Sequence, residues 1–444
     1  MCLFFNSHSV QTSNLFIFSL RCRESEIMQS PSKISGASAS TTTPAVCGLP
    51  GWADLPEGLL QSIIPLLGSF LELLAFTGTC RSWRSAFSSH PSKSTFCTLL
   101  PPLLVRPHIS VHAPHLPSRS DDGHELRTCQ VLDLANLKST LRCQIPEETF
   151  EELCFAGSSY GQLICGGGKN CLVVDVFTGA KVLPPQLPFD DDTYFYSGML
   201  TAPLTSHNSH LLVCAASNQR SIQSSLLDWP VGSDSWSELR LDDSRIEQIV
   251  EFNGQFIALD GSYRLYTLSL APELGLQEIA TVWWNGMNEC PYLRPWIVVC
   301  GDMLLMVDHY ITLSYDGAPV NYKAYRLDMS TVPAVWVEVK KLENYSLFIG
   351  SDVRSPAFSC TSPGRWGGRS NCLYYGYYYQ PWILHGLGDE ADAVWDPDND
   401  PDLVFKRNWY IRLQPFWVYP SMFYIGQWSM GSICLRWNFA FEFY

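Results

Sequence analysis

The spacing of apolar residues divides the chain into two parts. Between residues 54 and 87, apolar side chains recur three and four positions apart, which is the period of an amphipathic helix. Two such series are present: Leu59, Leu60, Ile63, Ile64 and Leu67, then Phe76, Cys80, Trp83 and Phe87. From Cys129 onward, short β-branched and aromatic runs alternate with Gly, Asn, Asp and Pro turns, without a long amphipathic helix. The pattern therefore predicts a small helical module followed by a large β domain.

Capping residues divide the first part into three short helices. Asp54 is the predicted cap of the first helix, with Pro56 in the first turn and Glu57 three residues after the cap. Ser69 and Glu72 repeat this spacing for the second helix. Three helices of this length cannot enclose all of their apolar side chains. We therefore expect an apolar surface that is left for a partner.

A loose repeat underlies the β domain. Turns inside hairpin-like stretches fall at Gly161, Gly254 and Gly301, at intervals of 93 and 47 residues, which fit two steps and one step of a propeller blade. Tryptophans near the ends of these units recur at similar intervals: Trp236, Trp284 and Trp336. The span from Cys129 to the C-terminus would hold about six or seven such units. The expected fold class is α+β multidomain, with a small all-α module and a large all-β domain that forms a β-propeller. A pair of β-sandwiches is the alternative, but it does not explain the spacing.

Amino-acid composition indicates the character of the segments outside the helical module and the β domain. Residues 1–50 are expected to be disordered, because residues 29–50 are rich in Ser, Thr, Ala and Pro. The apolar run within residues 1–27 is too short to span a membrane, and its positive charge follows the run, unlike that of a secretory signal. An organellar presequence stays open as an alternative. The expected boundaries are 51–90 for the helical module, 91–128 for a connector, 129–425 for the β domain and 426–444 for an atypical tail.

Charge and cysteine content narrow the class of protein. The 444 residues carry a net charge of −14 without a basic stripe, which argues against a protein that grips nucleic acid through phosphate contacts. The sixteen cysteines form neither a C-x-x-C pair nor a compact framework. Many lie in apolar runs, as reduced and buried thiols do: Cys154, Cys165, Cys214, Cys300 and Cys372. We therefore predict a location in the cytoplasm or nucleus, or in both, with a disulfide scaffold as the weaker alternative.

Three stretches resemble phosphate-, calcium- or zinc-binding motifs but lack residues that these motifs require. Residues 166–169 lack the first glycine and the Ser or Thr of a phosphate-binding loop, so a hairpin turn is predicted there. Residues 396–402 alternate aspartates like a calcium loop, but the required Gly and Glu are missing, which indicates a solvated acidic loop. His108, His112 and His115 have no nearby cysteine to complete a zinc set. Because no enzyme signature is recognised either, we predict a non-catalytic protein without a cofactor or metal.

The helical module resembles an F-box, by which substrate receptors dock onto Skp1 in cullin–RING ubiquitin ligases. The resemblance rests on the Leu-Pro start, the paired aliphatic residues, the Cys-x-x-Trp end, and the interval from Leu55 to Trp83. It implies that these side chains bind Skp1: Leu55, Pro56, Leu59, Ile63, Leu67, Leu71, Cys80 and Trp83. Two positions depart from the family. Pro65 should kink or end the first helix, and Leu71 stands near the place where many F-boxes carry an acidic residue. An ordinary buried helical hairpin is the alternative.

Residues 150–425 resemble the C-terminal domain of a large plant F-box family. That domain, formerly of unknown function, is described as a KIB-type, kelch-like β-propeller. Matching phrases follow one another in the family's order: residues 174–184, 252–260, 325–328, 336–339, 346–350, 371–375 and 416–421. The departures are Asp175-Val176 in place of Asn-Pro and an aromatic run over residues 374–379 in place of an acidic pair. The residues after Ser421 look unlike the family.

Together, the two resemblances imply a substrate-recognition subunit of an SCF-type E3 ubiquitin ligase, acting in protein ubiquitination and proteasomal degradation. The F-box would bind a Skp1-like protein and, through it, cullin, and propeller loops would bind an unknown target protein. Such a protein raises the effective concentration of target lysines near a ubiquitin-loaded enzyme. The alternatives are an interaction scaffold that does not assemble a ligase, and a propeller that binds a small ligand. Neither nucleic acid nor a membrane is an expected partner.

Overall fold

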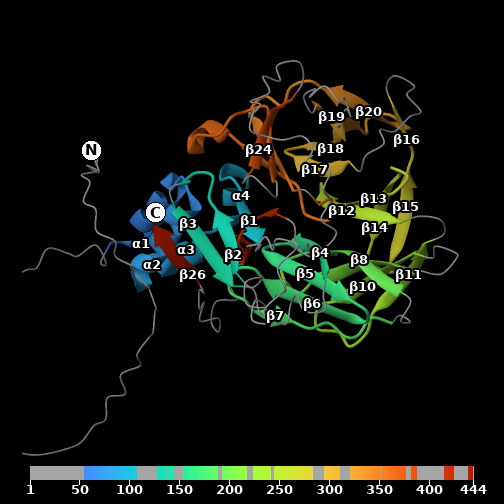
Figure 1. Ribbon diagram of the computed structural model, residues 1–444, viewed down its shortest axis with the longest axis horizontal. Helices are drawn as coiled ribbons and strands as arrows, with labels where there is room; N and C mark the ends of the chain where they lie inside the picture. Colours follow the sequence, from blue (N-terminus) through green and yellow to red (C-terminus); the bar gives the residue numbers. More distant parts are fainter. Residues whose placement is uncertain are drawn as a thin grey trace, which may run out of the picture.

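Short helices lie at the N-terminal end of the described chain, and β-strands form most of the remainder (Figure 1). The computed structural model describes residues 55–107, 128–137, 139–144, 154–188, 193–217, 224–241, 245–283, 295–310, 321–350, 352–376, 382–387, 415–424 and 439–443. The predicted segment 1–50 and the predicted cap Asp54 lie outside these residues. The predicted division into a helical module and a large β domain is confirmed.

Only the second helix of the helical module follows the predicted capping pattern. The elements of the module are α1 (Glu57–Ile63), η2 (Ile64–Leu66), α2 (Phe70–Thr79), α3 (Arg81–Ser89), η3 (Lys93–Thr95) and α4 (Phe96–Leu99). Helix α1 begins at Glu57 with Pro56 at the N-cap position and no side-chain cap, so the predicted cap position of Asp54 is wrong. Pro65 lies in the 3-10 turn η2, where α1 ends, because a proline cannot continue the hydrogen bonds of an α-helix. The Ser69 hydroxyl accepts a hydrogen bond from Glu72 N at 3.1 Å, and the Glu72 carboxylate accepts one from Gly68 N at 2.6 Å. This reciprocal cap fixes the start of α2.

The described strands form six sheets around a common axis, a six-bladed β-propeller (Figure 1). Blade 1 contains β4 (Cys154–Ser159), β5 (Gln162–Gly167), β6 (Asn170–Asp175) and β7 (Lys181–Val182). Blade 2 contains β8 (Thr193–Leu200), β9 (His210–Ser217), β10 (Ser224–Pro230) and β11 (Ser237–Leu241). Blade 3 contains β12 (Ile246–Phe252), β13 (Gln255–Asp260), β14 (Leu265–Ser269) and β15 (Gly275–Ile279).

The second half of the ring is less regular. Blade 4 contains β16 (Thr281–Trp283), β17 (Trp296–Cys300), β18 (Met303–Tyr310), β19 (Asn321–Asp328) and β20 (Ala334–Val339). Blade 5 contains β21 (Tyr345–Ile349), β22 (Phe358–Thr361), β23 (Cys372–Gly376) and β24 (Trp382–Gly386). Blade 6 contains β25 (Phe416–Val418), β1 (Leu103–Pro107), β2 (Thr128–Leu132), β3 (Ser139–Gln144) and β26 (Phe439–Phe443). Buried apolar side chains fill the spaces between adjacent blades.

The glycine spacing predicted from the sequence corresponds to one type of hairpin turn that recurs in three blades. Gly161, Gly254 and Gly301 each lie in the turn between the first two strands of a blade hairpin, at φ values of 80°, 75° and 61°. These left-handed conformations favour glycine, which has no Cβ. Gly168, at φ 54°, likewise forms the predicted hairpin between β5 and β6. Among the repeated tryptophans, Trp336 is buried in β20, and Trp284 lies outside the described residues.

Blade 6 is built from both ends of the described chain and closes the ring. β25 pairs with β1, with Trp417 opposite Leu104, and β26 pairs with β3. β1 lies within the predicted connector 91–128, and β26 lies within the predicted tail 426–444, so these two strands belong to the propeller and not to a separate connector and tail. The physical reason is pairing, because closing the ring satisfies backbone groups that an open sheet edge would leave exposed.

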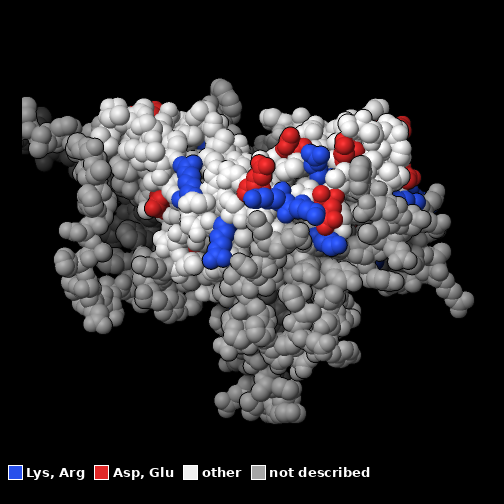
Figure 2. Space-filling model, turned by 90° about the horizontal axis from the view of Figure 1, so that it is seen from above, with Lys and Arg blue, Asp and Glu red and all other residues white. Residues whose placement is uncertain are grey.

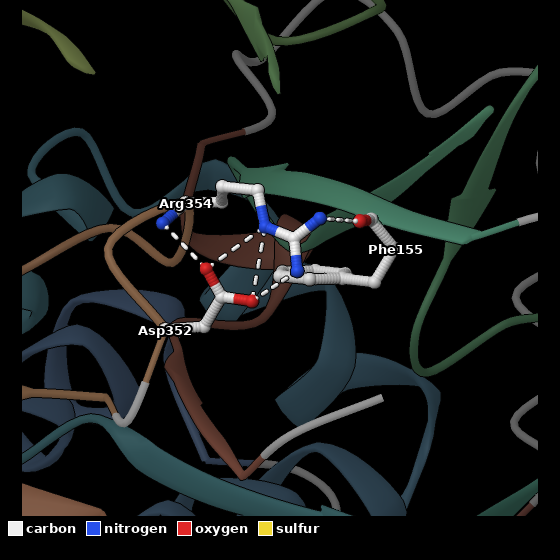
Figure 3. Close-up of polar contacts among 3 residues, drawn as sticks. All are labelled: Phe155, Asp352 and Arg354. Carbon is white, nitrogen blue, oxygen red and sulfur yellow. Dashed lines mark hydrogen bonds and ion pairs between the residues drawn. The ribbon is translucent and has the colours of Figure 1, made fainter. Parts of the chain in front are cut away.

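A charged contact ties blade 5 directly to blade 1. The Arg354 side chain lies in the loop between β21 and β22, and its guanidinium points at the Asp352 carboxylate and the Phe155 carbonyl (Figure 3). The Arg354 Nε lies 2.9 Å from Asp352 Oδ1, and Nη1 donates to Phe155 O in β4 at 2.7 Å. The contact therefore bridges two blades that are not neighbours in the ring.

The helical module shares one hydrophobic core with blades 1 and 6. In α2, the Phe70 ring centroid lies 6.0 Å from that of Phe177, which follows β6, and 6.2 Å from that of Phe423 near the C-terminal end of the propeller. The Asp133 carboxylate accepts a hydrogen bond from Leu71 N at 3.2 Å, and burial raises the pKa of this carboxyl. The module is therefore packed onto the ring.

Candidate functional site

The eight residues predicted to bind Skp1 lie in three environments. Pro56 and Leu59, on α1, are exposed, and 54% of the Leu59 surface is accessible to solvent. Five side chains are half-buried and pack against the shared core: Leu55, Ile63, Leu67, Leu71 and Trp83. Cys80 is half-buried at the start of α3. The structure thus places all eight on one small module, with different degrees of access to a partner.

The exposed apolar surface of α1 continues onto Leu66. This residue is 78% exposed and lies in η2, although it was not among the predicted contact residues. Its signal in the sequence is that it continues the aliphatic series that begins at Leu59, although α1 ends before it. Leu60 and Ile64, on the opposite face, are fully buried in the shared core. Helix α1 therefore buries Leu60 and Ile64 in the shared core and leaves Leu59 accessible.

Two predicted contact residues are held at the joint with the propeller. Leu67 and Leu71 both pack on the shared core, and the Leu71 N–H donates to the Asp133 carboxylate of blade 6. Arg365 in blade 5 donates to the Pro65 carbonyl, so η2 is also tied to the ring. These contacts fix the direction in which the exposed leucines point.

The start of α3 combines an aromatic contact with a half-buried thiol. The Trp83 ring centroid lies 4.7 Å from that of Phe76 in α2. The Cys80 Sγ lies 3.0 Å from the Ser82 hydroxyl. This hydrogen bond, followed by one from the Trp83 backbone, lowers the pKa of the Cys80 thiol. Cys80 is therefore the described thiol whose surroundings favour the thiolate at the surface of the module.

The other described cysteines have the burial expected of structural thiols. Nine cysteines are free in the described part of the chain, and six of them are buried. Burial raises the pKa of Cys214 and of Cys300 to about 12. Cys165 is buried and Cys372 is half-buried, whereas the side chain of Cys154 lies outside the described residues.

The described residues show no cluster of metal ligands. No group of three or more His, Cys, Asp and Glu within them could hold a metal ion. The predicted solvated loop at 396–402 and the three histidines between residues 108 and 115 lie outside them. Of the helices that the structure describes, none is long and apolar enough to cross a membrane. On the face seen in Figure 2, Lys and Arg side chains lie beside Asp and Glu side chains, and the colours do not separate into areas of one charge.

Comparisons with known proteins identify relatives that align with most of this chain. The sequence model of the KIB1-4 beta-propeller matches residues 131–403. F-box protein At3g25750 of Arabidopsis thaliana is 23% identical over 341 residues, which are 74% of this chain and 88% of that protein. F-box protein SKIP23 of Arabidopsis thaliana is 25% identical over 416 residues, 83% of this chain and 94% of that protein. The predicted resemblance to plant F-box proteins with a propeller domain is confirmed.

Similarity to solved structures is much weaker. The N-terminal domain of Nup159 is 14% identical, with a TM-score of 0.28, over 48% of this chain and 56% of that chain. The WD40 domain of SCAP from fission yeast is 11% identical, with a TM-score of 0.26, over 56% of this chain and 62% of that chain. No conclusion about function rests on these two matches.

Proposed function

Because the chain belongs to the KIB1-4 β-propeller family, we propose that it is the substrate-recognition subunit of an SCF-type E3 ubiquitin ligase. The helical module acts as the F-box that binds a Skp1-like protein and, through it, cullin. The propeller binds a target protein, which is then ubiquitinated and degraded by the proteasome. The F-box names of the two Arabidopsis relatives support an adaptor role, because their alignments span most of this chain.

The observation that carries the proposal is the accessible apolar face of the module. Leu59 is 54% exposed and Leu66 is 78% exposed, next to the exposed Pro56. Large apolar side chains that remain grouped at the surface indicate a partner site. Leu60 and Ile64 are buried in the shared core and are not available to a partner. A protein that docks on this module therefore has one apolar face available to it.

The rigid joint explains how such a protein would work without chemistry of its own. The shared core packs the module, which carries the proposed Skp1-binding face, against blades 1 and 6. A target held by the propeller is then kept near the ubiquitin-loaded enzyme that cullin brings, which raises the effective concentration of its lysines. The buried free thiols support a location in the cytoplasm or nucleus, where thiols stay reduced.

The proposal is tested by removing the exposed leucines. The double change Leu59→Ala and Leu66→Ala should weaken Skp1 binding by several hundredfold, because interface anchors typically contribute about 2 kcal/mol each. Leu183→Ala provides the matched control, because Leu183 is 76% exposed but lies beside β7 in blade 1. Binding is measured by titration calorimetry with purified Skp1. A folded double variant that binds Skp1 like wild type contradicts the proposal.

A second pair of changes tests the predicted start of the module. Leu55→Ala with Pro56→Ala should also reduce Skp1 binding, beside a separate Trp83→Ala variant. Because Trp83 packs against the shared core, its variant needs a thermal unfolding measurement to separate lost contact from lost fold. Co-purification of cullin with the tagged full chain then separates a ligase subunit from a scaffold that binds Skp1 alone.

A further inference from the structure

A groove lies between blades 3 and 4, away from the helical module. Its volume is about 460 Å³. One wall comes from the turn between β12 and β13, with Phe252 and Ile257, and from Ile279 at the end of β15. The other wall is the loop between β19 and β20, with Met329 and Val332. The groove is therefore built from two hairpins of neighbouring blades.

Exposed apolar side chains concentrate at this junction. Seven large hydrophobic residues are exposed in the described part of the chain, and two of them belong to the helical module. Three others are found here: Val332 is 97% exposed, Met329 is 46% exposed, and Val282 in the adjacent β16 is 42% exposed. Because such grouping at the surface indicates a partner site, the groove is, with the module, an apolar surface formed by the described residues.

The residues of the groove define the chemistry of its occupant. None of its eleven lining residues is charged, so burial of a charged group inside it would be unfavourable. The side-chain amides of Asn253 and Gln255 line the walls and can bond to a peptide backbone. The hydroxyls of Thr267 and Thr331 donate to Gln277 O and Pro333 O, and they can accept a hydrogen bond from a backbone N–H. The volume lies within the range of pockets that enclose most of a small ligand, which leaves room for one or two large side chains. An uncharged, apolar segment with an accessible backbone fits these walls.

The rim adds a negative charge to this apolar groove. Asp328 directly precedes Met329, and its carboxylate accepts a hydrogen bond from Ser330 N at 3.0 Å, on the loop that forms one wall. The hydrogen bonds from Ser330 and, to a smaller extent, the charge of nearby Arg326 lower the pKa of this carboxyl. Because the whole chain carries a net charge of −14, a basic residue beside the inserted side chains is electrostatically favoured.

The groove opens on the face of the ring to which the module is attached. The turn between β12 and β13 lines it, and the equivalent turn between β4 and β5 packs beside the module. At that second turn, the Tyr160 ring lies 5.0 Å from the ring of Tyr424, which is part of the segment that contacts the module. The Tyr160 hydroxyl also lies 3.5 Å from Glu251 Oε2, next to the groove residue Phe252. A segment in the groove is thus held on the same face as the module.

We propose that the groove between blades 3 and 4 binds an extended segment of the target protein, which inserts one or two large apolar side chains and places a Lys or Arg beside Asp328. This inference rests on the proposed function, since it assigns the target-binding role of the propeller to one surface.

The test selects short random peptides, displayed on phage, against the immobilised full chain. Selected peptides are then synthesised, and their affinity is measured by fluorescence anisotropy with wild type, Val332→Asp and Leu183→Asp. Val332→Asp puts a charge at the exposed mouth of the groove, whereas Leu183→Asp puts the same charge at an exposed leucine of blade 1. Skp1 binding and the oligomeric state are measured in parallel for all three proteins.

The expected peptides contain large apolar residues flanked by Lys or Arg. Val332→Asp should weaken the binding of these peptides about tenfold or more, whereas Leu183→Asp should bind them with wild-type affinity. Both variants should bind Skp1 with wild-type affinity. Asp328→Asn should weaken only the peptides that carry the basic residue. The inference is overturned if no selected peptide depends on Val332, if acidic peptides predominate, or if Val332→Asp dissolves a dimer that covers the groove. Loss of Skp1 binding by wild type would instead refute the proposed function, because peptide binding is measured separately.

Discussion

Phe423→Ala is the sharpest test of whether the helical module and the propeller form one folded unit. Phe423 is 3% exposed and follows β25, at the C-terminal end of the ring. Its ring lies 6.2 Å from that of Phe70 in α2 and 5.7 Å from that of Phe96 in α4. Truncation removes a ring from the joint without changing any residue of the module.

The magnitude follows from burial and from the two aromatic contacts. Replacing a buried phenylalanine with alanine costs about 3–5 kcal/mol, through lost transfer free energy and the cavity that remains. Aromatic pairs contribute about 0.5–1.5 kcal/mol of this loss. Since whole domains are stable by only about 5–15 kcal/mol, the variant should unfold at a clearly lower denaturant concentration. Because the core is shared, hydrogen exchange in α2 should accelerate together with the loss of propeller structure.

Phe252→Ala is the matched control for this experiment. Phe252 is 4% exposed and lies in the core between blades 3 and 4. Its truncation should lower global stability by a similar amount but leave the affinity for Skp1 unchanged under conditions where the protein is folded. Phe423→Ala should lower both the global stability and the affinity for Skp1. If Phe423→Ala leaves exchange in α2 and Skp1 affinity at wild-type values, the shared core does not position the module.

Three further predictions concern individual groups. Burial lowers the pKa of His385 from 6.5 to about 4. The folded state therefore loses stability as the pH falls from 6.5 towards 4, because the unfolded chain binds the proton more readily. His385→Phe should remove at most about 2 kcal/mol of the difference in unfolding free energy between pH 7 and pH 5, measured by urea unfolding. Gly161→Ala should destabilise the fold much more than Gly168→Ala, because a Cβ at Gly161 would meet the Ser421 backbone while Gly168 has free space; equal melting temperatures would contradict this. Cys80 should react with iodoacetamide faster than the buried cysteines, and bound Skp1 should slow the reaction.

Local rules explain why much of this architecture is readable in the sequence. The cap formed by Ser69 and Glu72 and the end of α1 before Pro65 depend on neighbours within four residues. The turn glycines Gly161 and Gly254 recur because each left-handed turn favours a residue without a Cβ. Helix ends, hairpins and the blade repeat are therefore set by short-range backbone chemistry.

Other features depend on residues that are far apart in the chain. Sequence periodicity does not reveal that β1 belongs to blade 6, because its partner strand β25 lies more than 300 residues away. The same applies to Phe70, which meets Phe177 and Phe423. Helical spacing treats Leu59 and Leu71 as equal apolar residues, yet the first is exposed and the second packs on the propeller core.

The candidate surfaces follow the same division. The sequence determined that the module has more apolar residues than three short helices can enclose. Only the tertiary structure decided which of them stay accessible, because Leu60 and Ile64 are buried in the core that the module shares with the propeller, whereas Leu66 remains in solvent. The groove with Met329 and Val332 has no sequence signal, since its two walls come from separate blades. The burial of a side chain depends on the residues that pack around it in the folded protein. A local sequence pattern predicts only how much apolar surface must be covered.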